Sequence, residues 1–208
     1  MNNYIVFDCE TGGLDPEKNP ITEIALIAFQ GEDFKEVGRY ETFVKPYGGK
    51  EYVPKALEMT GITMDMINSG IELKEFVKQV TVFLKAAKRK GRIRPVMAAH
   101  NAAFDQGMLE FAFHEAGKNL YELIDPVFID TMTWSRLKDP EKKKHNLPTV
   151  CERVGVEIVN AHRAMDDVEA TKQALMSFVG SLRGETATAA PTSSSVSHSP
   201  QGRITFKF

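Results

Sequence analysis

The chain has 208 residues, of which 42% are hydrophobic and 26% are charged, and its formal net charge is −2. These proportions are ordinary for a soluble globular protein, and no apolar run approaches the roughly 18 residues that a membrane-spanning helix requires. The N-terminus shows no secretory signal, and Cys9 and Cys151 lie too far apart to indicate a disulfide framework or a zinc site. We therefore expect a cytoplasmic protein with no membrane association.

Strands are predicted first along the chain. Apolar and β-branched residues indicate strands over residues 4–9, 22–30 and 37–45. A turn is expected over residues 12–16, where two glycines precede a proline. The short gap between the second and third strands, which contains Gly31 and Asp33, favours a hairpin.

Helices alternate with short strands in the second half of the chain. Apolar residues at helical spacing predict helices over residues 73–88, 102–117, 131–137, 147–154 and 166–182. Short strands are expected at 95–99 and 127–130. The last helix is expected to bury Val168, Leu175, Phe178, Val179 and Leu182. This order of elements predicts an α/β fold in which helices flank a mixed sheet.

The composition changes after the last predicted helix. Residues 1–183 are interpreted as one domain. Residues 184–200 are rich in Ser, Thr, Ala and Pro and are predicted to be a flexible linker, because they cannot bury enough apolar area to offset the entropy of ordering. Residues 201–208 are again apolar and alternating, and they either dock on a partner or form a strand on the domain's own surface.

The first candidate catalytic residues are Asp8 and Glu10, at the end of the first strand. Positions i and i+2 of a strand point to the same face, so both carboxylates project together. An exposed strand end with two solvated acids is the simpler alternative. The apolar run before Asp8 weakens it, because that run places Asp8 near the interior.

Further acids lie at the starts of predicted helices, namely Asp105 and Asp167, with His162 preceding the latter. Each acid alone could cap a helix or offset its dipole. Together with Asp8 and Glu10 they would form a cluster in which two charges ~4 Å apart repel by about 4 kcal/mol at an effective dielectric near 20. Such a cluster requires cations, and oxygen ligands suit Mg²⁺ or Mn²⁺.

Two divalent cations suit the hydrolysis of a phosphodiester. One ion activates the attacking water and the other stabilises the leaving 3′-oxygen. A histidine that titrates near neutrality can accept the proton of the water, and His162 is the candidate for this base. The negative net charge is compatible with a nucleic-acid substrate, because bound divalent cations neutralise the carboxylates that hold them.

Three segments resemble, in order, the motifs of the DnaQ-like exonucleases in their histidine-containing (DEDDh) branch. They are Phe7–Leu14, His100–Asp105 and His162–Ala170. Glu58–Thr63 and Asn146–Val156 are similar to intervening segments of the same family, so the resemblance covers about residues 4–180. It implies an α/β fold of the ribonuclease H-like type, with a five-stranded mixed sheet, the first strand central, and helices on its faces.

The resemblance also implies roles for the candidate catalytic residues. Asp8, Glu10, Asp105 and Asp167 correspond to the acids that hold two divalent cations, Mg²⁺ or Mn²⁺. Asp8 would bridge the two ions and Asp105 would act through water. His162 corresponds to the general base, and the family spacing from this histidine selects Asp167 over the adjacent Asp166.

Substrate-binding positions are implied in the same way. Thr11 and Leu14 correspond to residues that contact the terminal nucleotide, with Leu14 wedged near the last base, although turn packing is an alternative for both. The remaining pocket-wall candidates are Met59, Thr60, Asn101 and Phe104. Cys9 replaces a residue that is often Thr, small or apolar in the family, and we expect it to be a buried spacer because nothing cationic flanks it.

The function implied by the resemblance is that of a two-metal-dependent 3′–5′ exonuclease that releases nucleoside monophosphates from single-stranded or frayed 3′ ends. DNA is favoured as substrate because the tail imperfectly resembles peptides that bind sliding clamps, through Gln201, Ile204, Phe206 and Phe208. A sliding clamp or a DNA polymerase is therefore the expected partner. RNA 3′-end trimming stays open, since the motifs do not reveal how the site treats the 2′-OH. A catalytically silent nucleic-acid-binding module is the third alternative, disfavoured because no acid is missing.

Overall fold

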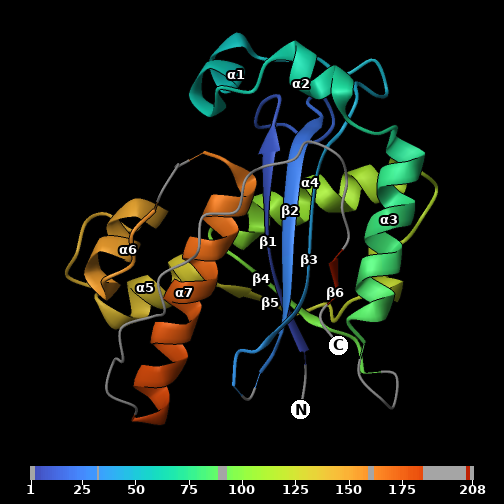
Figure 1. Cartoon of the computed structure of the whole chain (residues 1–208). Helices are drawn as coiled ribbons and strands as arrows, with labels where there is room; N and C mark the ends of the chain where they lie inside the picture. Colours follow the sequence, from blue (N-terminus) through green and yellow to red (C-terminus); the bar gives the residue numbers. More distant parts are fainter. Residues whose placement is uncertain (1–2, 32, 89–92, 159–161, 185–204, 207–208) are drawn as a thin grey trace.

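The centre of the fold is a mixed sheet with the strand order β5-β4-β1-β2-β3-β6 (Figure 1). The structure is a computed structural model that describes residues 3–31, 33–88, 93–158, 162–184 and 205–206. Its strands are β1 (Asn3–Thr11), β2 (Ile21–Gln30), β3 (Glu36–Phe43), β4 (Val96–Ala99), β5 (Phe128–Asp130) and the two-residue β6 (Thr205–Phe206). The predicted five-stranded α/β sheet with its first strand central is confirmed, and β6 extends it at the β3 edge.

Strand directions place the ends of three strands at one edge of the sheet. β1 is parallel to β4, and β4 is parallel to β5, so their carboxyl ends lie together. β1 and β2 are antiparallel, as are β2 and β3, which form the predicted hairpin. The burial of β2 over nine consecutive residues, Ile21–Phe29, reflects its position inside the sheet with both faces covered.

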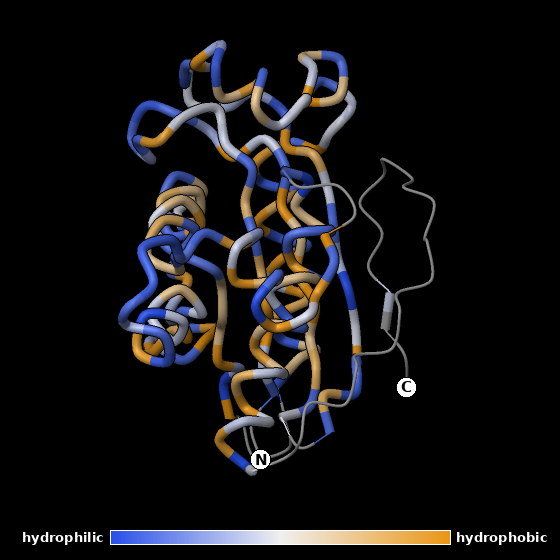
Figure 2. The backbone as a smooth tube through the Cα atoms, turned by 90° about the vertical axis from the view of Figure 1, so that its left-hand side faces the viewer, coloured by the Kyte–Doolittle hydropathy of each residue, from blue (hydrophilic) through white to orange (hydrophobic). Residues whose placement is uncertain are grey.

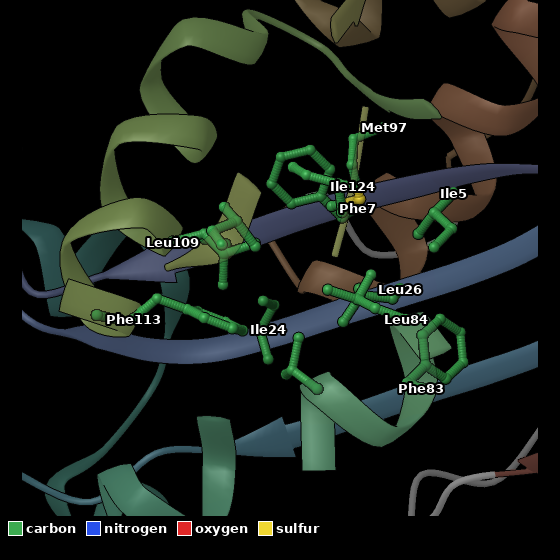
Figure 3. Packing of buried hydrophobic residues seen from close by; sticks show 14 of the residues in the cluster. Ile5, Phe7, Ile24, Leu26, Phe83, Leu84, Met97, Leu109, Phe113 and Ile124 are labelled. Carbon is green, nitrogen blue, oxygen red and sulfur yellow. The ribbon is translucent and has the colours of Figure 1, made fainter. Parts of the chain in front are cut away.

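Helices cover both faces of the sheet (Figure 1). The helical elements are α1 (Pro54–Thr60), α2 (Met64–Ser69), α3 (Leu73–Ala86), α4 (Ala102–Glu115), the 3₁₀ helix η1 (Leu120–Glu122), α5 (Thr131–Lys138), α6 (Leu147–Val154) and α7 (Ala164–Arg183). On one face, α3 and α4 bury a core that includes Phe7, Leu26 and Phe83 (Figure 3). On the other face, α7 packs its Val168 and Leu175 against the sheet. Figure 2 shows hydrophobic residues along the central strands.

The sequence analysis did not predict two short helices, α1 and α2. α1 contains no buried residue and α2 buries only Ile67, so neither shows the apolar periodicity from which helices are predicted. Both lie at the end of the molecule toward which the arrowhead of β1 points (Figure 1). Their position beside that end of the sheet is decided by tertiary structure.

The prediction that Leu182 belongs to the core face of α7 is wrong, because this side chain is 75% exposed. The last buried residue of the helix is Phe178, so the final turn of α7 extends beyond the core. Helical spacing identifies the apolar stripe of a helix, but it does not show where the neighbouring elements end.

The C-terminal segment pairs with the domain's own sheet where the structure describes it. Thr205 pairs with Arg39 and Phe206 with Gly38, antiparallel to β3. Gln201, Ile204, Phe208 and the predicted linker beyond Gly184 lie outside the described residues. For the backbone of residues 205–206 this pairing favours the alternative in which the segment forms a strand on the domain's own surface. Docking on a partner stays a prediction. Within the described parts of the chain, no helix combines the length and apolarity needed to cross a membrane.

Candidate active site

The carboxyl end of β1 carries the first two acids. Asp8 and Glu10 alternate with buried residues and share the sheet face of Val6, which packs in the cluster formed with α7. The register between β1 and β2 shifts directly after Glu10, between Glu10 and Thr11. Such irregularities redirect side chains at strand ends. This one lies one residue before the end of β1, where Thr11 still pairs with Ile21 of β2.

Asp105 reaches the same end of the sheet from α4. It lies in the first turn of this helix and is 3% exposed. The backbone N–H of Cys9 donates a hydrogen bond of 2.9 Å to Asp105 Oδ1, which joins the helix to β1. Because α4 begins shortly after the carboxyl end of β4, the parallel pairing of β4 with β1 brings Asp105 there. Cys9 is buried, as predicted, and burial raises the pKa of its thiol.

His162 and Asp167 arrive from the turn that begins α7. The backbone N–H of His162 donates a hydrogen bond of 3.1 Å to Asp167 Oδ2, and His162 has φ of +70° in the left-handed region. Side-chain ligand atoms of Glu10, His162 and Asp167 all lie within 4.8 Å of one another. The structure thus brings together residues from the two ends of the chain, and Asp166 is not part of this group.

Burial and, after it, the charges of neighbouring carboxylates raise the pKa values of these acids. Burial, followed by the charges of Asp167 and Glu23, raises the pKa of Glu10 to about 8. Burial also raises the pKa of Asp105 to about 7, against the lowering effect of the Cys9 N–H. The pKa of Asp8 is raised well above its ordinary value, first by burial and then by nearby carboxylates.

A cluster of this kind is unfavourable when it is ionised without a counter-charge. Within it, Glu10 and Asp167 offer carboxylate oxygens and His162 offers an imidazole nitrogen within 4.8 Å of one another, a group that does not include Asp8 or Asp105. Oxygen-rich donor sets suit Mg²⁺ and Mn²⁺. The residues present therefore fit a divalent cation.

A pocket of about 690 Å³ opens beside this cluster. Glu10 and His162 contribute to its lining, as do five of the predicted substrate-binding residues: Thr11, Leu14, Met59, Thr60 and Phe104. Its rim exposes large apolar side chains, with Leu14 83% and Met59 57% exposed. Exposed apolar surface around a concave site is typical of a binding surface.

Two predicted substrate-binding residues have other roles in the structure. Asn101 is not among the pocket-lining residues and stands at the N-terminus of α4 with φ of +67°, where its N–H donates to Asp130 Oδ1 at 2.9 Å. The Thr11 hydroxyl donates to the carbonyl of Gly13 at 2.7 Å, so it also stabilises the turn, as the packing alternative expected.

Comparison with known proteins identifies the family. Residues 5–175 match the family model RNase_T, described as "Exonuclease". The chain belongs to this exonuclease family. Among similar curated proteins are the PolC-type DNA polymerase III of Halalkalibacterium halodurans, 34% identical over 86% of this chain, and that of Thermotoga maritima, 30% identical over 86%. The chain spans only 11% and 12% of the length of these two relatives.

Solved structures agree with this family in fold. E. coli Exonuclease I in complex with a dT13 oligonucleotide matches with a TM-score of 0.75 at 22% identity, covering 88% of this chain and 42% of the other. An ExoI/SSB-Ct complex matches with a TM-score of 0.73 at 20% identity, covering 87% of this chain and 41% of the other. The predicted ribonuclease H-like fold and the predicted membership of the exonuclease family are confirmed.

Sequence reasoning missed several residues around the site of this exonuclease-family chain. Val53, Lys55 and Ala56 line the pocket from α1 and the residue before it. Because α1 itself was not predicted, nothing in the sequence indicated these residues. Glu23 was also missed, although it had a signal: it is an acid inside an apolar strand, within the nine consecutive buried residues Ile21–Phe29. A buried carboxylate requires a partner, so its presence in such a run indicates a specific contact.

Proposed function

We propose that this exonuclease-family chain removes nucleoside monophosphates from single-stranded or frayed 3′ ends of DNA, with two divalent cations, Mg²⁺ or Mn²⁺, as cofactors. The observation that carries the proposal is the approach of Glu10, His162 and Asp167 to within 4.8 Å beside an open pocket with an apolar rim. Such a site places charged groups for hydrolysis next to a surface that can receive a nucleotide.

The acids and the histidine have different roles in the proposed reaction. Asp8, Glu10, Asp105 and Asp167 would hold the cations, which when bound would supply activation of a water and stabilisation of the leaving oxygen. The exposed imidazole of His162 accepts the proton of the attacking water. The hydrogen bond from the backbone N–H of His162 to the Asp167 carboxylate fixes the position of this cation-binding acid relative to the base.

The pocket wall supports a preference for an unpaired terminal nucleotide. Leu14, Met59 and Phe104 provide apolar surface on which a base can pack, and a base that is still paired and stacked in a duplex would have to be freed first. The oligonucleotide named with E. coli Exonuclease I and the polymerase relatives favour DNA. RNA trimming is the alternative that the substrate comparison tests.

A degradation assay tests the proposal. An oligonucleotide labelled at its 5′ end should shorten stepwise in Mg²⁺, whereas a label in the 3′-terminal nucleotide should be released at once as a mononucleotide. Single-stranded DNA, duplex DNA and RNA of the same sequence should be degraded in that order of rate. Asp8→Ala should abolish release, because it removes a proposed cation-binding acid that interacts electrostatically with Asp105, Glu10 and Asp167.

Three results would contradict this proposal. Release that survives Asp8→Ala removes the assignment of the acids, and faster degradation of RNA than of DNA reverses the substrate choice. Binding of all three nucleic acids without degradation indicates a silent binding module.

We propose in addition that the C-terminal segment connects the chain to the replication machinery, through a sliding clamp or a DNA polymerase. The relatives support this context, because they are DNA polymerases in which the matching segment makes up about 11% of the length. A peptide tethered to the nuclease would raise its local concentration at the partner.

A further inference from the structure

We propose that Glu23 is a positioning residue: together with Arg163 it holds the turn that presents His162 and the first turn of α7 that presents Asp167. This inference rests on the proposed function, because it assigns the way in which the histidine and the acid of that site are kept in place. Glu23 lies on β2, directly opposite Glu10 on β1, and is 4% exposed.

Both carboxylate oxygens of Glu23 accept hydrogen bonds from the turn. Arg163 donates from Nε to Oε2 at 3.2 Å and from Nη2 to Oε1 at 2.9 Å. The backbone N–H of Ala164, the first residue of α7, donates to Oε2 at 3.2 Å. A two-pronged arginine–carboxylate pair restricts orientation as well as distance, and the added helix N–H is one that the helix itself leaves unsatisfied.

The backbone of the turn requires such support. His162 has a positive φ, which is uncommon for a residue with a side chain and persists only where surrounding contacts maintain it. Glu23 binds the two residues that follow His162, and the Arg163 guanidinium also lies 5.7 Å from the ring centroid of Phe43. The turn is thereby attached to β2 and β3 immediately before Asp167.

The same contacts give Glu23 a positively charged partner beside the cation-binding acids. Glu10 and Glu23 are cross-strand neighbours of like charge, which destabilise each other when nothing lies between them. Arg163 neutralises Glu23, and its charge lowers the pKa of Glu10 against the raising effect of its surroundings. Both oxygens of Glu23 are engaged by the turn, so its hydrogen bonds reach the site through residues 162–167.

The test compares Glu23→Gln, Arg163→Ala and Arg163→Lys with the control Glu169→Gln. Glu169 also lies on α7 and pairs with Arg39 of β3 at 2.7 Å, so the control removes an ion pair between the same helix and the sheet without altering the turn. Two readouts are used for the full chain: kcat and KM on single-stranded DNA, and amide hydrogen exchange of residues 162–167.

Glu23→Gln and Arg163→Ala should each lower kcat by about 10–100-fold, as loss of outer-shell partners does at metal sites, with KM changed less than about threefold. The amides of residues 162–167 should exchange faster in both variants. Arg163→Lys keeps the charge without the fork and should recover part of kcat. The double variant Glu23→Gln, Arg163→Ala should have a kcat no lower than that of the slower single variant, because both substitutions remove the same Glu23–Arg163 contact. Glu169→Gln should match wild type in kcat and in exchange over residues 162–167.

Several outcomes would overturn the proposal. The first two are kcat within twofold of wild type in Glu23→Gln and unchanged amide exchange of residues 162–167. The third is a loss of kcat in the double variant that equals the product of the losses in the two single variants. The fourth is recovery of Glu23→Gln activity by about tenfold more Mg²⁺, which would make Glu23 a cation ligand. If Glu23→Gln does not fold, the two Arg163 variants carry the same test from the less buried side of the pair. A wild-type protein that degrades no nucleic acid contradicts the proposed function, whereas the exchange measurement still decides whether Glu23 holds the turn.

Discussion

Asp166 and Asp167 are adjacent residues in the first turn of α7 with different surroundings. Asp167 accepts the N–H of His162 and belongs to the group with Glu10, whereas Asp166 is outside that group. Successive residues of a helix are rotated by about 100°, so only one of two neighbours can face a given site. The spacing argument that selected Asp167 therefore has a direct geometric counterpart.

This pair provides a matched test at the scale of one residue. Asp167→Asn should lower kcat on single-stranded DNA by at least about 100-fold, because it removes a charged ligand and leaves the volume almost unchanged. Asp166→Asn has the same chemistry one position away and should keep kcat within about threefold of wild type. Equal losses in the two variants would contradict the assignment of Asp167.

At the scale of the element, the site depends on segments whose own patterns are weak. The α1 helix has no buried residue, yet Lys55, Ala56, Met59 and Thr60 from it line the pocket. Its N-terminal end is held by a backbone hydrogen bond, in which the N–H of Val53 donates to the carbonyl of Gly12 at 2.6 Å. The pocket wall is thus attached to the turn that follows β1.

A deletion tests the role of the C-terminal segment, residues 201–208, which contains the short strand β6. Deleting residues 201–208 should lower the affinity of the chain for a sliding clamp or polymerase by at least tenfold if this segment is the docking peptide. The melting temperature should change by less than about 2 °C, because two paired residues contribute little to a domain of this size.

Nuclease activity on free single-stranded DNA serves as the control for this deletion and should be unchanged. Unchanged affinity for the partner would contradict the docking role. It would leave the pairing with β3 as the role of residues 205–206.

At the scale of the whole molecule, the acid cluster links stability to pH and to divalent cations. The pKa values of Glu10, about 8, and Asp105, about 7, are raised in the folded chain above those of ordinary carboxyl groups. Between the unfolded and folded pKa values the folded state binds more protons than the unfolded state. The stability that these two carboxyl groups contribute to the metal-free protein should therefore be fully present at low pH and be lost as pH rises through this window.

Thermal unfolding at constant ionic strength measures this effect. In EDTA, the melting temperature should be lower at pH 8 than at pH 5.5, and millimolar Mg²⁺ or Mn²⁺ should recover most of the difference by binding the folded state. Glu10→Gln should raise the melting temperature of the metal-free protein at pH 8 by about 2 °C or more and reduce its dependence on pH. Glu152→Gln, at an exposed position of α6, should follow wild type. A metal-free protein that becomes more stable from pH 5.5 to pH 8 would contradict the prediction.

Much of the architecture follows from local patterns in the sequence. Apolar runs and helical spacing report which side of a segment avoids water, and they predicted the five main strands and five of the helices. Acids at the ends of those elements indicated the site, because parallel strands place their carboxyl ends at one edge. The resemblance to the DEDDh exonucleases then distinguished Asp167 from Asp166.

Contacts between distant segments were decided only by the tertiary structure. Glu23 and Arg163 are 140 residues apart, and nothing local to either residue specifies the other as its partner. The same holds for the pocket residues on α1, for the exposure of Leu182 and for the pairing of β6 with β3. A sequence pattern reports the burial that a segment needs, whereas the identity of the neighbour that provides it depends on how the whole chain packs.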